Sequence, residues 1–295
     1  MHAYRLFGLT FHSEIPLPEL IPAPAGSVAD VTIEHGTVPR SDGDFAHGLI
    51  STPEGAVFTV RPVGRFRMSG GNRIEIDAKP DADPARLRLF LLGSAIGATL
   101  LQRGMRPLHA NAIDMGGYAI AFTGPSQAGK STLAAAFHDR GHRLLSDDVC
   151  VITPGADSGY DAQPGLPRMR LWADAIERTG RDAEALDVAV DGLDKFVVPT
   201  VDAQPQTALP LRAIFVLTKG DDAVSIRPVT GMAAAKALIT NTYRAAFVPA
   251  ATSPADHLDR WLGVVRTVPI FELARPWDAE RIGETIDAVE AHLAG

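Results

Sequence analysis

The segment from Gly124 to Ser131 constrains the fold of this 295-residue sequence more than any other. It reads GPSQAGKS and fits the pattern G-x-x-x-x-G-K-[ST] of a phosphate-binding loop, or P-loop. The glycines of such a loop let backbone N–H groups wrap a phosphate, and the N-terminus of the next helix adds the positive end of its dipole. The motif works only between a strand and a helix, so we expect these elements on its two sides.

The residues around the P-loop predict both elements and a third one. Two apolar stretches, 108–115 and 118–123, flank Gly116-Gly117 and predict a β-hairpin before the loop. Residues 131–139 predict a helix, and residues 143–152 predict a further strand. A strand, a glycine-rich loop, a helix and a strand in this order form a βαβ unit with a parallel pair, which indicates an α/β fold.

Composition excludes several other classes of protein. A hydrophobic fraction of 46% and a charged fraction of 21% are those of an ordinary globular protein, which rules out disordered and fibrous chains. With 28 Lys and Arg against 35 Asp and Glu, the net charge of −7 does not favour nucleic acid as a partner. The single cysteine, Cys150, cannot form an intramolecular disulfide, and we expect it to be a buried structural thiol.

Neither the N-terminal residues nor the apolar interior of the chain predicts contact with a membrane. The first residues contain no apolar stretch long enough for a signal-peptide core, so we expect a cytoplasmic protein. The longest apolar stretch, residues 89–101, is shorter than the roughly 20 residues that span a bilayer. We interpret it as a buried helix.

The chain changes character near residue 83, where we place a domain boundary. Residues 1–82 contain short alternating segments between Pro and Gly residues, which predict antiparallel strands of a small β-rich domain. At Asp83-Pro84 a helix is expected to begin, with Asp83 as a candidate N-cap, and residues 83–295 form the second domain. The predicted strands and helices elsewhere are strands at 30–34, 65–68, 72–77, 209–218 and 268–273, helices at 232–247 and 278–293, and loops with short helices across 153–206.

Asp147 and Asp148 are the candidate acidic partners of the P-loop. They lie at the end of the apolar strand segment that follows the predicted helix. The carboxyl end of a strand in a parallel sheet lies beside the phosphate loop, so both carboxylates would face the γ-phosphate and its metal. One of them can bind Mg²⁺ while the other accepts a proton. Lys130 would reach the β and γ phosphates, and the Ser131 hydroxyl would bind Mg²⁺.

Together these residues resemble the catalytic domain of the HPr serine kinase/phosphorylase family. The resemblance rests on His109, the hairpin, the P-loop, the RGHRL segment at 140–144 and the Asp147-Asp148 pair, and it covers about residues 107–152. A looser form of the arrangement occurs in ATP-dependent phosphoenolpyruvate carboxykinase. The resemblance implies an α/β protein with a P-loop kinase domain of the HPr kinase/phosphoenolpyruvate carboxykinase type, preceded here by the small β-rich N-terminal domain.

The resemblance also implies an activity and the residues that perform it. The activity is ATP- and Mg²⁺-dependent phosphorylation of a serine hydroxyl on a protein or peptide, with Lys130 at the phosphates. Asp147 would be the base toward that hydroxyl, Asp148 and Ser131 would bind the metal, and His109 would lie near the phosphates or the Asp pair. The nucleotide-binding residues that it implies are Gly124, Pro125, Ser126, Gln127, Ala128, Gly129, Lys130, Ser131 and Thr132.

The sequence departs from the family pattern at the P-loop and beyond it. Gln127 stands where the family usually has Gly, and Thr132 stands where it has an acidic residue. The later glycine-rich segment that the family uses for phosphorolysis has no clear counterpart. We therefore expect transfer to run one way, without phosphorylase activity.

A second resemblance concerns the acceptor. Residues 167–172 and 194–196 resemble a sub-group of the family that is encoded beside lasso-peptide biosynthesis genes and is thought to phosphorylate the precursor peptide. A phosphoryl-transfer enzyme needs extra cations for the charge of its transition state. In this region Arg168, Arg170 and Lys195 are the candidates to contact the substrate.

Two other functions stay open from the sequence. The chain could be a non-catalytic ATP-binding regulator, or a small-molecule or carboxykinase-like phosphotransferase. Intact Lys130, Ser131, Asp147 and Asp148 favour an enzyme over a regulator that only binds nucleotide. The oligomeric state, homo-oligomers included, stays open as well.

Overall fold

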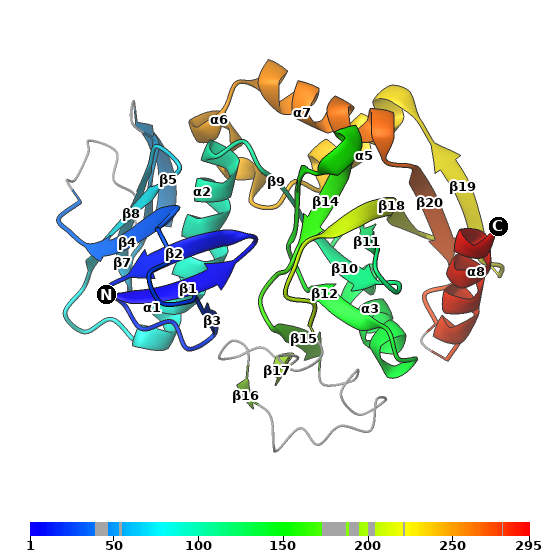
Figure 1. The fold of residues 1–295 in the computed structure, drawn as a ribbon, viewed down its shortest axis with the longest axis horizontal. Coiled ribbons are helices and arrows are strands. Elements are labelled where there is room, and N and C mark those ends of the chain that lie inside the picture. The colour runs from blue at the N-terminus through cyan, green and yellow to red at the C-terminus, as the bar shows by residue number, and fades with distance from the viewer. Residues whose placement is uncertain are drawn as a thin grey trace. The chain divides into compact units, whose positions relative to one another are not determined.

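The computed structural model describes residues 1–38, 47–52, 55–172, 187–188, 195–199, 204–220, 222–278 and 280–295. The chain divides into two compact units, and both contain strands and helices (Figure 1). Unit 1 comprises Met1–Pro107 and Thr242–Arg260, and unit 2 comprises Leu108–Asn241 and Trp261–Gly295. The protein is therefore of mixed α/β composition.

Unit 1 is built on a mixed sheet with the strand order β3-β1-β2-β4-β8-β7-β6-β5 among the described residues. Its strands are β1 (His2–Leu6), β2 (Leu9–Ser13), β3 (Ile21–Pro22), β4 (Val31–His35), β5 (His47–Thr52), β6 (Gly55–Val60), β7 (Gly64–Ser69) and β8 (Arg73–Ala78). The strands predicted at 30–34, 65–68 and 72–77 are confirmed as β4, β7 and β8. The expected antiparallel pairing is wrong for β4, which runs parallel to both β2 and β8. Alternation in a sequence fixes which face of a sheet each residue takes, but it does not fix the direction of the neighbouring strand.

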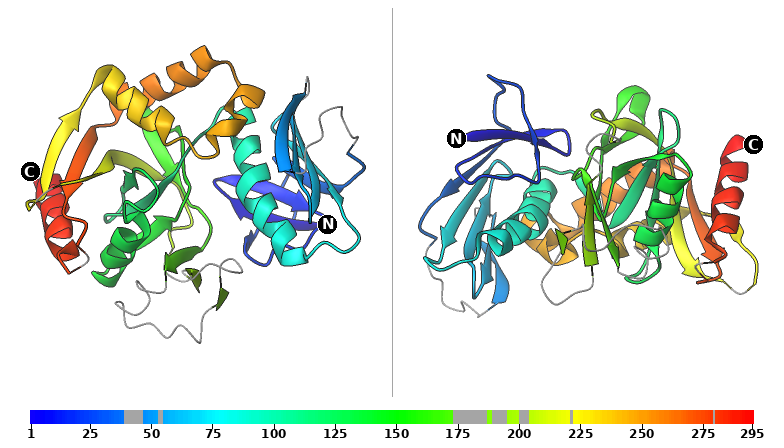
Figure 2. Two further views of the ribbon diagram at one scale, coloured as in Figure 1. Left: turned by 180° about the vertical axis from the view of Figure 1, so that it is seen from behind. Right: turned by 90° about the horizontal axis from the view of Figure 1, so that it is seen from below.

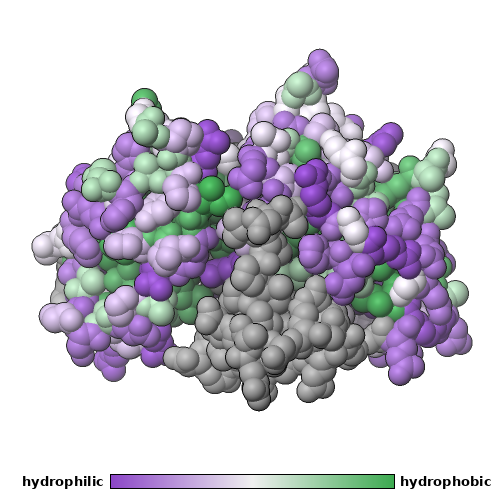
Figure 3. Space-filling view, turned by 60° about the horizontal axis from the view of Figure 1, so that its bottom comes forward, coloured by the Kyte–Doolittle hydropathy of each residue, from purple (hydrophilic) through white to green (hydrophobic). Residues whose placement is uncertain are grey.

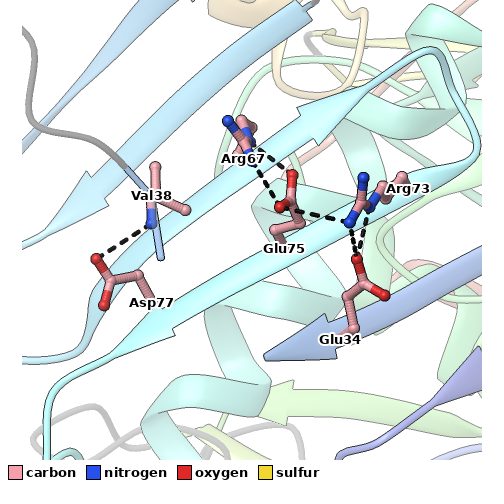
Figure 4. Close-up of polar contacts among 6 residues, drawn as sticks. All are labelled: Glu34, Val38, Arg67, Arg73, Glu75 and Asp77. Carbon is pink, nitrogen blue, oxygen red and sulfur yellow. Dashed lines mark hydrogen bonds and ion pairs between the residues drawn. The ribbon is translucent and has the colours of Figure 1, made fainter. Parts of the chain in front are cut away.

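Alternating residues of β7 separate a buried face of this sheet from a charged one. Phe66 and Met68 are fully buried, whereas Arg65 and Arg67 point to the opposite face. Arg67 Nε and Nη2 donate to the two carboxylate oxygens of Glu75 on β8, each at 2.6 Å (Figure 4). These hydrogen bonds and the positive charge of Arg67 lower the pKa of Glu75 against the effect of its burial. Since Arg67 and Glu75 are direct cross-strand partners, this pair supports the observed register of β7 and β8.

A long helical stretch follows the sheet of unit 1. It consists of α1 (Pro84–Phe90), a π-helical turn (Leu91–Ala95) and α2 (Ile96–Gln102). The Asp83 carboxylate accepts a hydrogen bond from Ala85 N at 2.9 Å, so the predicted N-cap is confirmed. Among the described residues, Pro84–Gln102 is the one helix that could cross a membrane by length and composition. Within the protein, 61% of its most apolar window is buried, as the sequence predicts for a core helix.

This helical stretch packs on the sheet of unit 1, so the observed division of the chain differs from the expected boundary at residue 83. Gln102 at the end of α2 donates to Met68 O of β7 and accepts from Gly71 N, both at 3.0 Å. A C-terminal segment also joins unit 1, with a 3₁₀ turn (Ala245–Phe247), α6 (Val248–Ala251) and the first half of α7 (Pro254–Thr267). The Phe58 ring of β6 lies 6.1 Å from the ring of Phe90 and 5.6 Å from that of Phe247, which ties these segments together. Such long-range packing is not visible in local sequence patterns.

Unit 2 is built on a second mixed sheet, which carries the P-loop. Among the described residues its strand order is β12-β10-β11-β18-β14-β13-β9, with β20 paired to β18 and β19 paired to β20. Its strands are β9 (Arg106–Leu108), β10 (Ala110–Asp114), β11 (Ala119–Thr123), β12 (Arg143–Ser146), β13 (Cys150–Pro154), β14 (Tyr160–Gln163), β18 (Leu209–Lys219), β19 (Ser225–Val229) and β20 (Ile270–Arg275). β11, β18 and β20 run parallel to one another. The predicted hairpin at Gly116-Gly117 is confirmed as β10 and β11.

The expected parallel pair on the two sides of the P-loop helix is wrong, because β10 lies between β11 and β12. β10 is antiparallel to both, so β11 and β12 run in the same direction without pairing. Asp114, the last residue of β10, helps to fix this order. Its buried carboxylate accepts from Gly116 N at 3.0 Å, from Gly117 N at 2.8 Å and from Arg143 Nε of β12 at 2.9 Å. One side chain thus holds both the hairpin turn and the first residue of β12.

Helices cover both faces of the unit 2 sheet (Figure 2). α3 (Lys130–Asp139) and α8 (Ile282–Ala294) pack on one face. The core there contains a row of stacked rings, with centroid distances of 5.3 Å from Phe137 to Phe122, 5.5 Å from Phe122 to Phe215 and 5.5 Å from Phe215 to Phe271. α5 (Gly231–Thr240) and the second half of α7, with the buried Trp261, cover the other face. The sheet is therefore buried on both sides, which suits the apolar sequences of its central strands.

Three other predicted segments differ from the structure. For 153–206 the sequence predicts loops with short helices; the described parts contain one short 3₁₀ helix (Ala156–Ser158) and also strands, including β15 (Arg168–Trp172), β16 (Asp187–Val188) and β17 (Lys195–Pro199). Pro164, Gly165 and Pro167 lie between β14 and β15, where they interrupt the alternation of the sequence. The helix predicted over 232–247 ends at Thr240, and its C-cap residue Asn241 donates from Nδ2 to Ala237 O at 2.8 Å. The last helix begins at Ile282 instead of residue 278.

Cys150, the first residue of β13, is fully buried, as the sequence predicts. Burial raises the pKa of its thiol to about 12. The thiolate is the reactive form of cysteine, so we expect iodoacetamide to leave the native protein unmodified at pH 8. Because the chain has one cysteine, intact-mass spectrometry should show a single adduct after unfolding in denaturant and none before. An adduct formed at the same rate in native and unfolded protein would contradict this placement.

Large apolar side chains are scarce on the surface of the part that the structure describes. Those that are exposed are Met1, Val28, Met232 and Trp277. Figure 3 shows hydrophilic residues over much of one face, with apolar residues between them. Trp277 lies two residues after the end of β20.

Candidate active site

The P-loop joins the end of β11 to the start of α3, as the sequence predicts. Three of its residues have positive φ angles: Gly124 (+146°), Gln127 (+66°) and Gly129 (+79°). A Cβ atom on Gly124 would lie 2.9 Å from Leu217 O, so glycine lets the loop start close against β18. Gln127 is strained by comparison, because side chains other than glycine rarely adopt this conformation.

Lys130 is the first residue of α3 and turns back into the loop. It is only 7% exposed, and its Nζ donates to Gly124 O at 2.9 Å and to Pro125 O at 3.0 Å. Ser131 and Thr132, the next residues of the helix, are half-buried, and residues 125–127 are exposed. Residues 125–127 of the loop therefore face solvent, whereas the side chain of Lys130 lies inside the loop. An anion at this helix N-terminus would meet backbone N–H groups and the lysine charge together.

The register of three strands brings the candidate catalytic residues to one edge of the sheet, which we call the site edge. Ala110 at the start of β10 pairs with Thr123 at the end of β11. Ser146 at the end of β12 pairs with Ala112. Residue 109 before β10, residue 124 after β11 and residue 147 after β12 therefore lie side by side. Thr123 Oγ1 donates to the backbone oxygen of residue 109 at 2.9 Å, which closes this edge.

Asp147 and Asp148 lie in a break between β12 and β13, where the sequence predicts one continuous strand. Asp147 is 7% exposed, and its backbone oxygen accepts from Val149 N at 2.9 Å in a tight turn. Asp148 takes a positive φ of +70°, which aspartate tolerates better than most side chains. Because of this break, the side chains of the two consecutive aspartates do not have to point to opposite faces of the sheet, as neighbouring residues in a strand do. One of them is buried and the other is half-buried.

His109 contacts Asp148. Its Nδ1 lies 3.3 Å from Asp148 Oδ1 and 3.0 Å from Asp148 O, and its backbone N donates to Asn241 O at 2.8 Å. The backbone of His109 is thus held by β11 and by the end of α5, while its ring meets the second aspartate. The structure brings the histidine, the P-loop and the acidic pair together at the site edge. The chemical roles given to them above stay predictions.

The three candidate substrate cations lie on β15 and β17, which pair antiparallel. Gly165, just before β15, donates to Leu145 O at 3.0 Å, so the start of this region lies next to the end of β12. Arg168 is half-buried at the first position of β15. Arg170 on β15 and Lys195 on β17 are placed by their backbones, with Lys195 opposite residue 172, and their side chains lie outside the described part. The structure therefore brings Arg168 toward the site edge by its backbone and leaves the other two as predictions.

Arg275 is a site residue that the sequence interpretation missed. It is the last residue of β20, whose register with β18 (Lys219 opposite Arg275) continues the site edge past the P-loop. Its Nη2 donates to Ala128 O of the P-loop at 3.0 Å. It lies at the carboxyl end of a third parallel strand, a position where binding residues gather, but the sequence does not show that this strand is parallel to β11 and β18.

Asn111 is a second polar residue that the interpretation missed. It lies on β10 within the site edge and is 1% exposed. Neither its amide nitrogen nor its amide oxygen has a hydrogen-bond partner among the described residues. A buried amide without partners costs stability, and such groups occur at functional sites more than in ordinary cores.

The residues at the site edge fit a magnesium nucleotide. The P-loop places Lys130 and the start of α3 where phosphates would bind, and the donor set of Ser131 and Asp148 consists of the hard oxygen ligands that Mg²⁺ prefers. No group of three or more His, Cys, Asp or Glu side chains able to hold a metal occurs in the described ranges. Mg²⁺ bound with phosphates commonly uses only one or two carboxylates, so a larger cluster is not required.

Among known proteins, no family model and no curated protein matches the sequence. Among solved structures, the HPr(Ser) kinase/phosphatase from Coxiella burnetii matches with 14% sequence identity and a TM-score of 0.36. That match covers 64% of this chain and 99% of the other chain.

Proposed function

We propose that this protein is an ATP- and Mg²⁺-dependent kinase that transfers the γ-phosphate of ATP to a serine hydroxyl of a protein or peptide. The observation that carries the proposal is the site edge itself. A P-loop with its lysine, a pair of consecutive aspartates and a histidine come from three separate strand ends and meet there. One carboxylate is enough to help hold Mg²⁺ at a nucleotide switch, so the second carboxylate of the pair favours an enzyme over a non-catalytic switch.

The position of each residue at the site edge suggests its role in binding the nucleotide and the metal. The backbone N–H groups of the P-loop and the ammonium group of Lys130 hold the phosphates, and Ser131 and Asp148 hold the metal. ATP supplies the phosphoryl group, and Mg²⁺ neutralises part of its charge. His109 orients the Asp148 carboxylate through the 3.3 Å contact of its Nδ1. The lysine, the loop and the metal ligands would together hold the phosphates of the nucleotide at the site edge.

We assign the role of general base to Asp147, because its carboxylate is buried beside the P-loop end of the sheet. The acceptor oxygen bonds to the γ-phosphorus as the bond from that phosphorus to the bridging oxygen of ATP breaks, and the hydroxyl proton goes to the Asp147 carboxylate. Burial of Asp147 keeps water away from the carboxylate, which protects the phosphoryl group from hydrolysis. The metal role falls to Asp148, which is the more exposed of the two and has a histidine beside it.

The acceptor we propose is a serine in a flexible or terminal peptide segment, as in a lasso-peptide precursor. The 167–172 and 194–196 segments, which resemble those of the lasso-peptide sub-group, support a peptide acceptor. We assign to Arg168 at the start of β15 the contact with a carboxylate of that peptide or with the transferred phosphoryl group. We expect transfer to run one way, because the segment that the family uses for phosphorolysis has no clear counterpart.

Incubation with γ-labelled ATP tests this function. Candidate precursor peptides and phosphocarrier proteins should gain one phosphoryl group by mass spectrometry, and peptides with the acceptor serine changed to alanine should gain none. The phosphopeptide should stay intact when enzyme and inorganic phosphate are added. Transfer only to a small metabolite would favour the carboxykinase-like alternative, and loss of the phosphoryl group to inorganic phosphate would contradict one-way transfer.

A further inference from the structure

The end of β20 places a buried positive charge against the P-loop. Arg275 is 4% exposed, and its Nη2 donates to Ala128 O at 3.0 Å while its Nη1 donates to Pro276 O at 3.1 Å. A Cβ atom on Gly129 would lie 2.4 Å from the same Nη2, so the guanidinium occupies the space above the last glycine of the loop. The side chain therefore touches both residues that precede Lys130.

This charge has no acidic partner within the described part of the chain. The Nε of Arg275 is buried without a hydrogen-bond acceptor, and both acceptors of its other nitrogens are neutral backbone carbonyls. Burial lowers the pKa of the guanidinium, and no carboxylate among the residues that the structure describes offsets that effect. A buried cation that is only partly satisfied costs stability, so a purely structural contact at this place would be better served by an apolar side chain.

We propose that Arg275 is a positioning residue of the phosphate site: it holds the P-loop at Ala128 and Gly129 and supplies a buried positive charge that polyphosphate binding balances. The inference rests on the P-loop of the proposed function, but it concerns phosphate binding and does not depend on what accepts the phosphoryl group. Arg275 acts from the β20 side of the loop, and Lys130 acts from within it. Two cations on the two sides of residues 128–129 give the loop its affinity for a highly charged anion.

The proposal predicts opposite effects of Arg275→Met on stability and on binding. Methionine keeps much of the length of arginine and removes the unbalanced charge, which offsets the loss of the donor to Ala128 O and Pro276 O, so the unfolding midpoint without ligand should stay the same or rise. The dissociation constant for tripolyphosphate and for MgATP should rise about 10- to 100-fold, as expected for loss of a charged partner. Arg275→Lys retains the charge and should lose less affinity than Arg275→Met. Adenosine, which carries no phosphate, should be unaffected by either change.

Titration calorimetry and thermal unfolding of the full chain test these effects, with Arg227→Met on β19 as the control because Arg227 is exposed. Unchanged tripolyphosphate affinity in Arg275→Met, together with a lower unfolding midpoint, would mean that the residue is only structural. If Arg275→Met does not fold, equal losses of affinity in Arg275→Lys and in the control would overturn the proposal. Binding that depends on Arg275 in a protein without transfer activity would support this inference and count against the proposed kinase. If the wild type transfers phosphate but its affinity for tripolyphosphate does not depend on Arg275, the result would support the proposed kinase and contradict the inference about Arg275.

Discussion

Replacing Lys130 with alanine is expected to reduce kcat for phosphoryl transfer by about 10² to 10³-fold, the usual cost of removing one donor that stabilises transition-state charge. The Nζ of Lys130 lies inside the loop, 2.9 Å from Gly124 O and 3.0 Å from Pro125 O, so its charge sits at the centre of the loop. The two carbonyls lose a charged donor in the variant, which should lower the free energy of unfolding by about 1–3 kcal/mol. The fold should survive this loss, since the side chain belongs to neither apolar cluster of unit 2.

Initial-rate kinetics and a thermal melt of the same preparation check this prediction. The matched control is Lys236→Ala, which removes an exposed lysine from α5 of the same unit. The control should retain wild-type kinetics. If Lys130→Ala transfers phosphate at the wild-type rate, or if both variants lose activity equally, the P-loop does not bind the reacting phosphates.

The parts of the site that the sequence predicted are those whose geometry is local. The motif at 124–131 fixes its own turn, because glycines at 124 and 129 adopt positive φ and the helix must begin directly after them. Asp83 likewise marks the start of a helix through a hydrogen bond to a residue two positions away. Strands with clear alternation, such as β7 and β8, were equally visible. In each case the stabilising contact lies within a few residues of the signal.

The order of strands could not be predicted in this way. β10 separates β11 from β12 because the buried Asp114 binds both the hairpin turn and Arg143, a contact that spans 29 positions. The break at Asp147-Asp148 was hidden for a different reason. The apolar residues on both sides of the pair continue one strand pattern, and only the positive φ of Asp148 shows that the chain turns there.

Arg275 shows that site residues far from a motif in the sequence are harder to predict than the motif itself. It is 147 positions from the loop carbonyl that it binds, and its own neighbours give no motif. Only the parallel register of β11, β18 and β20 places it at the P-loop. Asn111 could not be predicted for a similar reason, because a single polar residue in an apolar strand forms no sequence pattern that marks a functional site. Residues that complete a site from distant strands follow from topology, which the sequence alone leaves open.

The two aspartates are expected to respond differently to replacement by asparagine. Asp147→Asn should lower kcat by about 10² to 10⁴-fold, the usual contribution of a general base, and leave the affinity for MgATP nearly unchanged. Asp148→Asn should weaken MgATP binding and raise the Mg²⁺ concentration needed for half-maximal activity, because an amide is a poorer ligand for a hard cation than a carboxylate. The structure supports this division, since Asp147 is buried whereas Asp148 is half-buried beside His109.

Single-turnover rates separate the chemical step from binding, and calorimetric titration with MgATP at several Mg²⁺ concentrations measures the metal dependence. Asp81→Asn, which changes an exposed aspartate in unit 1, is the matched control and should alter neither quantity. His109→Gln should resemble a mild form of Asp148→Asn, because it removes the ring that contacts the Asp148 carboxylate at 3.3 Å. A slow chemical step in Asp148→Asn with weak metal binding in Asp147→Asn would show that the two roles are exchanged. Equal loss of MgATP affinity in both would mean that both carboxylates bind the metal and that the base must be sought elsewhere at the site edge.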